Sequence, residues 1–257
     1  MSLNIRFLGT GAAEGIPTIG CKCDHCQRAH RERGKLTRER TAIIFSLPGY
    51  ELLVDTPPGI RQILDRNRVR HLDGIFITHE HNDHSGGAQE FRYWPDRVDL
   101  FVEADVYPRL VREDWDEYMT EITFYLPYRP GLPVRFNDFF FVPFEVSHST
   151  RTFGIAVWHE ARKIVYISDS DSRFSNYARC LMQDAALLIA NTPFFNSPPG
   201  EAHIDVEGTL ALKEQVKAKQ LILTHINHHN RPHDVLEAYA SQFEGVTIAY
   251  DGMKIEI

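Results

Sequence analysis

The sequence has no apolar run long enough to cross a membrane, and its first residues, MSLNIRFLGT, contain no cleavable apolar segment. It also lacks internal repeats, low-complexity tracts and linkers, so we expect residues 1–257 to form a single domain. A basic excess is absent too, since the formal net charge is −7, which argues against a nucleic acid partner. These absences predict a cytoplasmic globular protein.

Cysteine is scarce, and three of the four cysteines stand together in CKCDHC. In a reducing compartment, Cys21, Cys23 and Cys26 are more typical of a metal site than of disulfide bonds. We therefore expect a small zinc-binding loop at residues 21–26. The fourth cysteine, Cys180, stands alone, and we expect it to be a small buried side chain on a helix.

Histidine, by contrast, is abundant, with 13 residues, and three of them fall in the segment HEHNDH. His79 and His81 are two residues apart, so in an extended segment their side chains point to the same side. Asp83 and His84 follow a break at Asn82 and can face a second point. A polar loop that is rich in histidine by chance is a poor explanation for this density of ligands. The segment predicts a loop that supplies ligands to two metal ions.

Further ligand types follow apolar segments that are typical of strands: His148, Asp169 and His225 each come one serine or threonine after such a segment. We expect strands at residues 4–8, 41–47, 50–54, 74–78, 98–102, 139–146, 152–158, 163–167, 186–190, 220–223, 246–250 and 253–257. Helices are expected at residues 60–67, 85–93, 105–118, 176–184, 206–217 and 234–243, with a solvated helix or loop at 27–40. This order predicts an α/β fold of two mixed sheets packed face to face, with helices outside.

Catalytic and binding residues commonly lie at strand ends in such folds. The repeated position of these candidates after strands therefore strengthens the case for each of them. One hydrolytic ion needs three protein ligands and an open position, and seven ligands therefore suit two ions. Asp169 is the natural bridge because a carboxylate has two oxygens. Alone, each of His148, Asp169 and His225 would be interpreted as an ordinary hydrogen-bonded residue.

Several other features have more than one interpretation. Asp55, at the end of a predicted strand, either supports the metal loop or caps a helix. The glycine-rich loop after the first strand, GTGAAEGIP, either approaches a phosphate or forms a tight turn. The aromatic segment 115–128 can wall a pocket, form a homodimer contact or, for most of its residues, simply pack in the core; it comprises Trp115, Tyr118, Phe124, Tyr125 and Tyr128.

HEHNDH followed by Ser85-Gly86-Gly87 resembles the HxHxDH motif of the metallo-β-lactamase superfamily. GTGAAEGIP, CKCDHC and THINHH together are similar to the PhnP group of phosphodiesterases, from the carbon–phosphorus lyase pathway of phosphonate breakdown, over nearly the whole chain. The resemblance implies the αββα sandwich of that superfamily. It also implies one ion held by His79, His81 and His148, a second held by Asp83, His84 and His225, and Asp169 between them.

The same resemblance assigns Cys21, Cys23, Cys26 and His228 to a structural zinc ion, which the Cys3His composition supports. His25 and His229 are the alternative fourth ligands. The two active-site ions are expected to be Mn2+ or Zn2+, about 3.5–4 Å apart, with a bridging hydroxide as nucleophile and Asp83 as a catalytic ligand. His203 matches a functional histidine of the subgroup and is expected to be a general acid or a phosphate contact, whereas a helix-entry histidine is the plain alternative. Arg151 is either a phosphate contact or a surface residue.

The substrate implied is a cyclic ribose phosphodiester of the 5-phosphoribosyl 1,2-cyclic phosphate type. The positive charge that two divalent ions leave beside two aspartates and a hydroxide favours an anionic ester. An RNA-processing nuclease of the same superfamily is the first alternative, but the net charge and the lack of a long basic insertion oppose it. A PqqB-like accessory or binding protein would have a degraded ligand set, whereas all seven ligands are present here. A thioester or lactone hydrolase is a further alternative.

Overall fold

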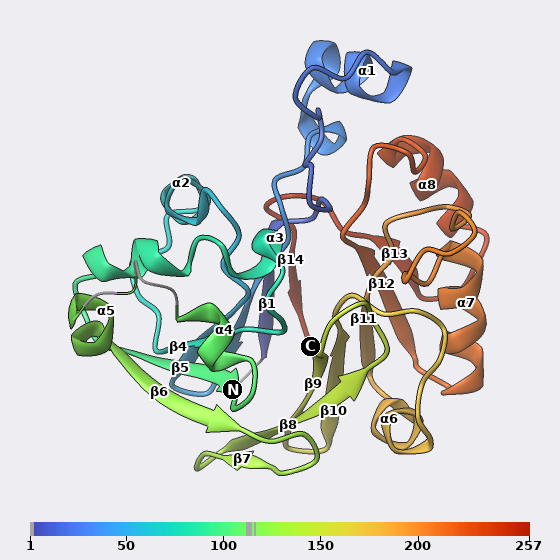
Figure 1. Ribbon diagram of the computed structural model, residues 1–257. Helices are drawn as coiled ribbons and strands as arrows, with labels where there is room; N and C mark the ends of the chain where they lie inside the picture. The colour runs from blue at the N-terminus through green and yellow to red at the C-terminus, as the bar shows by residue number, and fades with distance from the viewer. Residues whose placement is uncertain (1–2, 112–114, 116) are drawn as a thin grey trace.

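The computed structural model describes residues 3–111, 115 and 117–257, with no side chain described at 117 or 118, and its core is two mixed β-sheets packed face to face. Helices cover the outer sides of this sandwich (Figure 1). The α/β class and the arrangement of layers confirm the prediction. Within the described residues, no helix is both long and apolar enough to span a bilayer.

The first sheet is parallel from β3 to β6 and antiparallel across β14, β1, β2 and β3. In spatial order its described strands are β14 (Lys254–Glu256), β1 (Asn4–Gly9), β2 (Ala42–Leu47), β3 (Tyr50–Val54), β4 (Gly74–Phe76), β5 (Val98–Glu103) and β6 (Thr123–Tyr128). Tyr128 stacks on Phe76, with ring centroids 4.7 Å apart, and donates a hydrogen bond from its hydroxyl to the carbonyl of Ile77.

The second sheet is parallel from β13 to β10 and antiparallel from β10 to β7. In spatial order its described strands are β13 (Val246–Ile248), β12 (Gln220–Thr224), β11 (Leu187–Asn191), β10 (Arg162–Ile167), β9 (Thr152–His159), β8 (Phe139–Val146) and β7 (Val134–Arg135). Both faces of β11 are buried, as expected for a parallel strand covered on two sides.

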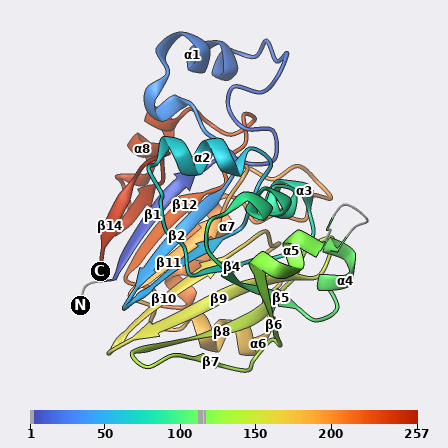
Figure 2. The same ribbon diagram turned by 90° about the vertical axis from the view of Figure 1, so that its left-hand side faces the viewer.

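Alternation along the strands divides the core into two clusters. On β11, Leu187 and Ile189 point to the first sheet, while Leu188 and Ala190 point to the helices outside. Figures 1 and 2 show the helices in two groups and α1 standing apart at the top of the molecule. The helices are α1 (Asp24–Glu32), α2 (Ile60–Arg66), α3 (Asn82–Ser85), α4 (Tyr107–Leu110), α5 (Glu117–Ile122), α6 (Asn176–Met182), α7 (Val206–Gln215) and α8 (His233–Ala240), with 3-10 turns at Gly34–Leu36 and Ala88–Tyr93.

Three expectations about local structure were wrong. The helix expected at 85–93 is interrupted after α3, because the backbone at Gly86 and Gly87 passes too close to its neighbours; a Cβ at Gly87 would lie 2.2 Å from the carbonyl oxygen of Pro57. The helix expected at 105–118 is not continuous in the described residues: α4 covers Tyr107–Leu110 and α5 begins at Glu117, while residues 112–114 and 116 lie outside the described part. The aromatic segment contains strand β6, which we did not predict.

Candidate metal centre

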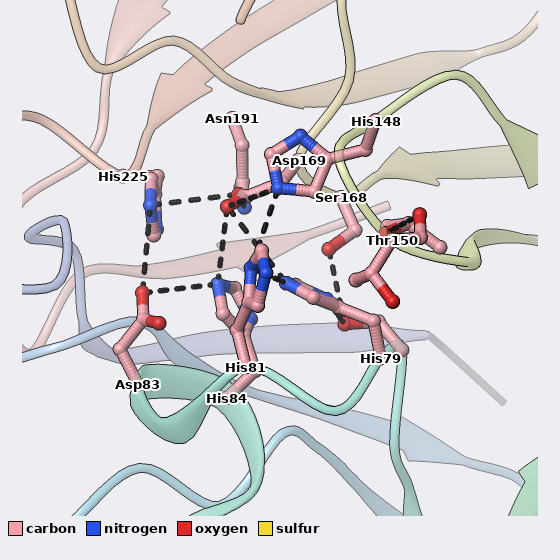
Figure 3. A network of polar contacts seen from close by, with 12 residues as sticks. His79, His81, Asp83, His84, His148, Thr150, Ser168, Asp169, Asn191 and His225 are labelled. Atoms are coloured by element: carbon pink, nitrogen blue, oxygen red, sulfur yellow. Dashed lines mark hydrogen bonds and ion pairs between the residues drawn. The ribbon is translucent and has the colours of Figure 1, made fainter. Parts of the chain in front are cut away.

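The ligand-bearing strand ends meet at one edge of the sandwich, as the sequence predicted. His79 and His81 follow β4, and His148, Asp169 and His225 follow β8, β10 and β12. The remaining two candidates, Asp83 and His84, lie on the single turn of α3. Figure 3 shows the seven side chains pointing toward a common centre.

The seven residues form two sets that share Asp169. In the first set, the inward atoms are Nε2 of His79, Nδ1 of His81 and Nε2 of His148, with Asp169 Oδ2 3.9 Å from the first and 3.8 Å from the third. His81 Nδ1 lies 3.1 Å and 3.4 Å from the Nε2 atoms of His79 and His148.

In the second set, His84 Nε2 lies 3.3 Å from Asp83 Oδ2 and 3.5 Å from Asp169 Oδ2. His225 Nε2 lies 3.5 Å from Asp169 Oδ1 and 3.9 Å from Asp83 Oδ2. Ligands about 2.1 Å from an ion in tetrahedral geometry would be about 3.4 Å apart, so both sets have the spacing of a coordination shell. His84 Nε2 is buried without a hydrogen-bond partner, which fits a metal ligand.

Hydrogen bonds outside the ligand sets fix the orientation of four imidazoles. The Nδ1 atoms of His79, His84, His148 and His225 lie 2.7–3.0 Å from oxygens of Thr78, Asp55, Ala202 and Thr41, respectively. These partners assign the Nδ1–H tautomer and leave each Nε2 lone pair free to face the centre. Of these partners, only Asp55 was a candidate from the sequence.

Asp55 supports the metal loop and does not cap α2, whose N-cap is Gly59. Its buried carboxylate accepts bonds from the amide and hydroxyl of Thr78, at 2.9 and 3.0 Å, and from His84 Nδ1 at 2.7 Å. Asp169 is held in turn by Asn191, whose amide donates to Oδ1 at 2.8 Å. Asn191 ends β11, so the strand-end pattern that identified the ligands would have identified this residue too.

The electrostatics of the site favour a cation. Burial lowers the pKa values of His79, His81 and His148, and that of His225 to about 4, so these imidazoles are neutral and can donate a lone pair near pH 7. His84 behaves differently: burial lowers its pKa, but the surrounding carboxylates outweigh burial and raise it well above the usual value. The second set therefore carries a surplus of negative charge.

The cavity above the two sets measures about 400 Å³. His203 lines it, with its ring centroid 4.9 Å from that of His148, and its buried Nδ1 has no hydrogen-bond partner among the residues that the structure describes. Ala12, Ala13 and Glu14 also line it, whereas Gly9 and Gly11 pack against the backbone of residues 38–40. The glycines thus allow close backbone packing, and the loop contributes to the cavity through the residues that follow them.

Two other candidates lie away from the cavity. Arg151 forms ion pairs with Glu103, Asp105 and Glu145, so it is a surface residue engaged with carboxylates. No residue of the aromatic segment that has a described side chain lines the cavity: Tyr128 is buried in the core, Tyr125 stacks on Tyr107, and Phe124 is exposed. The side chain of Tyr118 is outside the described part.

The cysteines gather around His228. Its Nδ1 lies 3.4 Å from Cys21 Sγ and 3.7 Å from Cys23 Sγ, and Cys26 completes the group. Sulfur and nitrogen ligands of one tetrahedral zinc ion would be about 3.6 Å apart. Burial raises the pKa of Cys26 to about 11, so keeping this thiol ionised needs a cation. These distances and charges fit a structural zinc ion.

The alternative fourth ligands and the last cysteine have other positions. His25 Nδ1 lies 3.1 Å from the carbonyl oxygen of His228, so it supports the ligand segment, and His229 is outside the group. Cys180 was expected to be buried, but it is exposed on α6. Helix α6 has only seven residues and buries Ala178 and Met182, so Cys180 lies on its exposed side.

The comparisons with known proteins agree with this architecture. Curated relatives include a Porphyromonas gingivalis protein named octanoyltransferase, 24% identical over 87% of this chain and 46% of its own length. This chain therefore spans less than half of that relative. Ribonuclease Z of Archaeoglobus fulgidus is 23% identical over 100% of this chain and 98% of its own length.

Solved structures with the same fold include a diphosphatase from the PhnP family, with a TM-score of 0.86 and 24% identity over 99% of this chain and 98% of that one. Zn2+-bound PqqB from Methylobacterium extorquens has a TM-score of 0.85 and 17% identity over 99% of this chain and 100% of that one. The sequence profile of the Beta-lactamase superfamily domain matches residues 50–226. With its HxHxDH segment, its two facing sheets and this match, the chain belongs to the metallo-β-lactamase superfamily and resembles the PhnP family in fold.

Proposed function

We propose that the protein is a phosphodiesterase that uses two divalent ions, Mn2+ or Zn2+, to hydrolyse a cyclic ribose phosphodiester of the 5-phosphoribosyl 1,2-cyclic phosphate type. The observation that carries this proposal is the pair of ligand sets that share Asp169. The names diphosphatase and ribonuclease, carried by two of the similar proteins, denote hydrolysis at phosphorus and support the same reaction class.

The residues of the centre divide into the ligands of two ions. His79, His81 and His148 would hold one ion, and Asp83, His84 and His225 the other, with Asp169 as a ligand of both. Bound at these sets, the ions supply an activated water molecule and neutralise the negative charge of the phosphoryl group.

We further propose that His203 acts on the leaving group or on a phosphate oxygen. It lies in the cavity beside His148 but belongs to neither ligand set, and its Nδ1 has no protein partner. An imidazole in this position can donate a proton to the departing alkoxide or bind a phosphate oxygen. We assign it that role.

Ribonuclease activity is the second candidate function, because this chain is similar to ribonuclease Z over its whole length. The lining of the cavity opposes it: the residues around the ligand sets include Glu14 and Glu201 and, within the described part, no lysine or arginine. A protein that binds RNA tightly needs cations for the phosphate backbone. The complete ligand set likewise opposes a non-catalytic, PqqB-like role. Cleavage of a precursor tRNA that is faster than hydrolysis of the cyclic diester would reverse this ranking.

The experiment that tests the proposal is the Asp83→Ala variant assayed with bis(p-nitrophenyl) phosphate. We expect hydrolysis to be abolished, because the second ion loses one of its four ligands, while the protein stays folded and keeps the zinc ion of the cysteine group. Asp65→Asn is the matched control, since Asp65 is an exposed residue of α2. Unchanged turnover in the Asp83 variant would refute the proposed mechanism.

A further inference from the structure

A second polar cavity, of about 520 Å³, lies where the chain returns from α1 to the first sheet. It is separated from the metal centre by residues 12–15, and Glu14 lines both cavities. The carboxylate of Glu14 accepts a hydrogen bond from the side-chain amide of Asn227. The second cavity is lined by Glu14, Gly15, Ile16, Pro17, Arg33, Thr37, Arg38, Glu39, Arg40, Arg66 and Asp251.

Arginine dominates this lining, with four residues against three acids, in a protein whose net charge is negative. The acids are already engaged by the protein. Asp251 accepts hydrogen bonds from the Thr10 hydroxyl and the Glu39 amide, both at 2.6 Å. The carboxylate of Glu39 pairs with Arg66. Four guanidinium groups and three carboxylates, 4 − 3, leave the lining with a formal charge of +1.

Within the described residues, the remaining arginines form no direct ion pair with a carboxylate, although the charge of Asp251 acts on Arg38. Arg38 is buried and donates to Thr10 Oγ1, to the carbonyl of Ala249 and to His233 Nδ1. Arg40 donates through Nε to the carbonyl of Ala13, and its two terminal nitrogens have no protein acceptor.

Arg33 adds an independent argument. It has φ 54° and ψ −144°, a conformation that is essentially restricted to glycine, and no hydrogen-bond or ionic partner is found for its side chain in the described structure. Glycine would adopt this backbone without strain. The strained backbone ends helix α1, and the exposed guanidinium group, which lines the cavity, is available to a ligand.

We propose that this cavity binds a phosphate monoester group, held by the guanidinium groups of Arg33 and Arg40 in front of the buried Arg38. A guanidinium group presents paired N–H donors that match the oxygens of a phosphate dianion. The cavity is larger than a phosphate ion, so the rest of a small molecule can be accommodated with it. The proposal concerns a site outside the metal centre and does not depend on hydrolytic activity.

The test is calorimetric titration of inorganic phosphate into the full-length protein with Asp169→Asn, which removes the shared ligand of the metal centre. We expect phosphate to bind this protein, and Arg33→Ala in the same background to weaken binding by at least about tenfold. Arg61→Ala is the matched control, because Arg61 is an exposed arginine outside this cavity. Unaltered phosphate affinity in the Arg33 variant, or no binding in its parent, would overturn the proposal.

A second variant guards against loss of binding through misfolding. Arg33→Gly relieves the backbone strain, so we expect a higher Tm together with weaker phosphate binding. Arg40→Ala is less suitable alone, because Arg40 also bonds to Ala13 beside the metal centre. A variant that is more stable but binds phosphate as tightly as its parent would contradict the role of Arg33.

Steady-state kinetics in the otherwise unmodified protein identify the source of the phosphate group. If it is the second phosphate of the substrate itself, Arg33→Gly will raise KM for 5-phosphoribosyl 1,2-cyclic phosphate and leave KM for bis(p-nitrophenyl) phosphate unchanged. If it belongs to a separate molecule, both KM values will stay the same while phosphate binding is lost. Both results support the site, and they differ only in its ligand.

Discussion

At the scale of single residues, Asp55 shows how the loop that carries the metal ligands is held in place. Asp55 is not itself one of the seven ligands. It adopts φ 65°, and its carboxylate joins the start of the loop, at Thr78, to the ligand His84. Mutation of a residue that orients a metal ligand in this way typically lowers metal affinity or activity.

We therefore predict that Asp55→Asn lowers the affinity of the centre for Mn2+ or Zn2+ by about 10–100-fold. Asparagine tolerates the left-handed backbone, so the change acts on hydrogen bonding: its amide replaces one carboxylate oxygen with a donor facing other donors. Metal titration by calorimetry measures the effect, with Asp65→Asn as the control. Equal affinities in the two variants would show that Asp55 does not orient His84.

The role of His203 is also a question for single-residue chemistry. If His203 protonates the leaving group, His203→Gln should slow hydrolysis of the cyclic ribose diester by about 10²–10⁴-fold, because an alkoxide leaves poorly without a proton. The same variant should hydrolyse bis(p-nitrophenyl) phosphate almost as fast as the unmodified protein, since p-nitrophenolate leaves without help. Equal losses on both substrates would point to phosphate binding, and no loss on either would leave His203 without a catalytic role.

At the scale of elements, the strand ends explain why much of the centre was predictable. A strand buried on both faces gives a clear apolar run, so the polar residue that follows it stands out, as Asp169 does after β10. Two other features had no such local signal. Strand β6 lacks clear alternation of buried and exposed residues. The break between α3 and the next turn depends on Pro57, which lies far from Gly87 in sequence. Partners such as Thr41 have no local signal, because only the fold brings them to His225.

The contact between the segment before β2 and helix α8 gives a prediction of pH dependence. Arg38 donates to Nδ1 of His233, at the start of α8, so His233 is neutral in the folded protein. Burial and the charge of Arg38 lower the pKa of His233 to about 4, against about 6.5 in an unfolded chain. The folded state therefore resists protonation, and stability that is fully present above about pH 6.5 is lost as the pH falls toward 4.

The size of this effect is up to about 3 kcal/mol, because one pKa unit corresponds to about 1.4 kcal/mol. In His233→Gln the side chain can still accept a hydrogen bond from Arg38 but cannot titrate, so the free energy of unfolding should fall less between pH 6.5 and 4. Urea unfolding at several pH values measures it, with exposed His71→Gln as the control. The metal ligands titrate in both proteins, so the difference between them reports on His233. Parallel pH profiles would contradict the assignment.

At the scale of the whole molecule, charge and topology act together. The chain is acidic, and the cavity above the ligands has no described lysine or arginine, so bound ions are the main positive charge there. The metal centre and the cysteine group each take one ligand from the short segment after β12. His225 belongs to the metal centre, and His228 belongs to the cysteine group. The sequence predicted both groups because HEHNDH and CKCDHC cluster locally, because three more ligands follow predicted strands, and because the family resemblance assigns His228. The arginine cavity could not be predicted, since its residues come from four separate segments of ordinary composition.

The most direct test of the account is the metal content of the purified chain, measured by mass spectrometry. We expect about three ions per chain: two at the sets that share Asp169 and one at the cysteine group. Cys23→Ser should retain about two and unfold at a lower Tm, and Asp169→Asn should retain about one. If the unmodified protein binds no more than one ion, or if Asp169→Asn keeps all three, the binuclear centre does not exist as described.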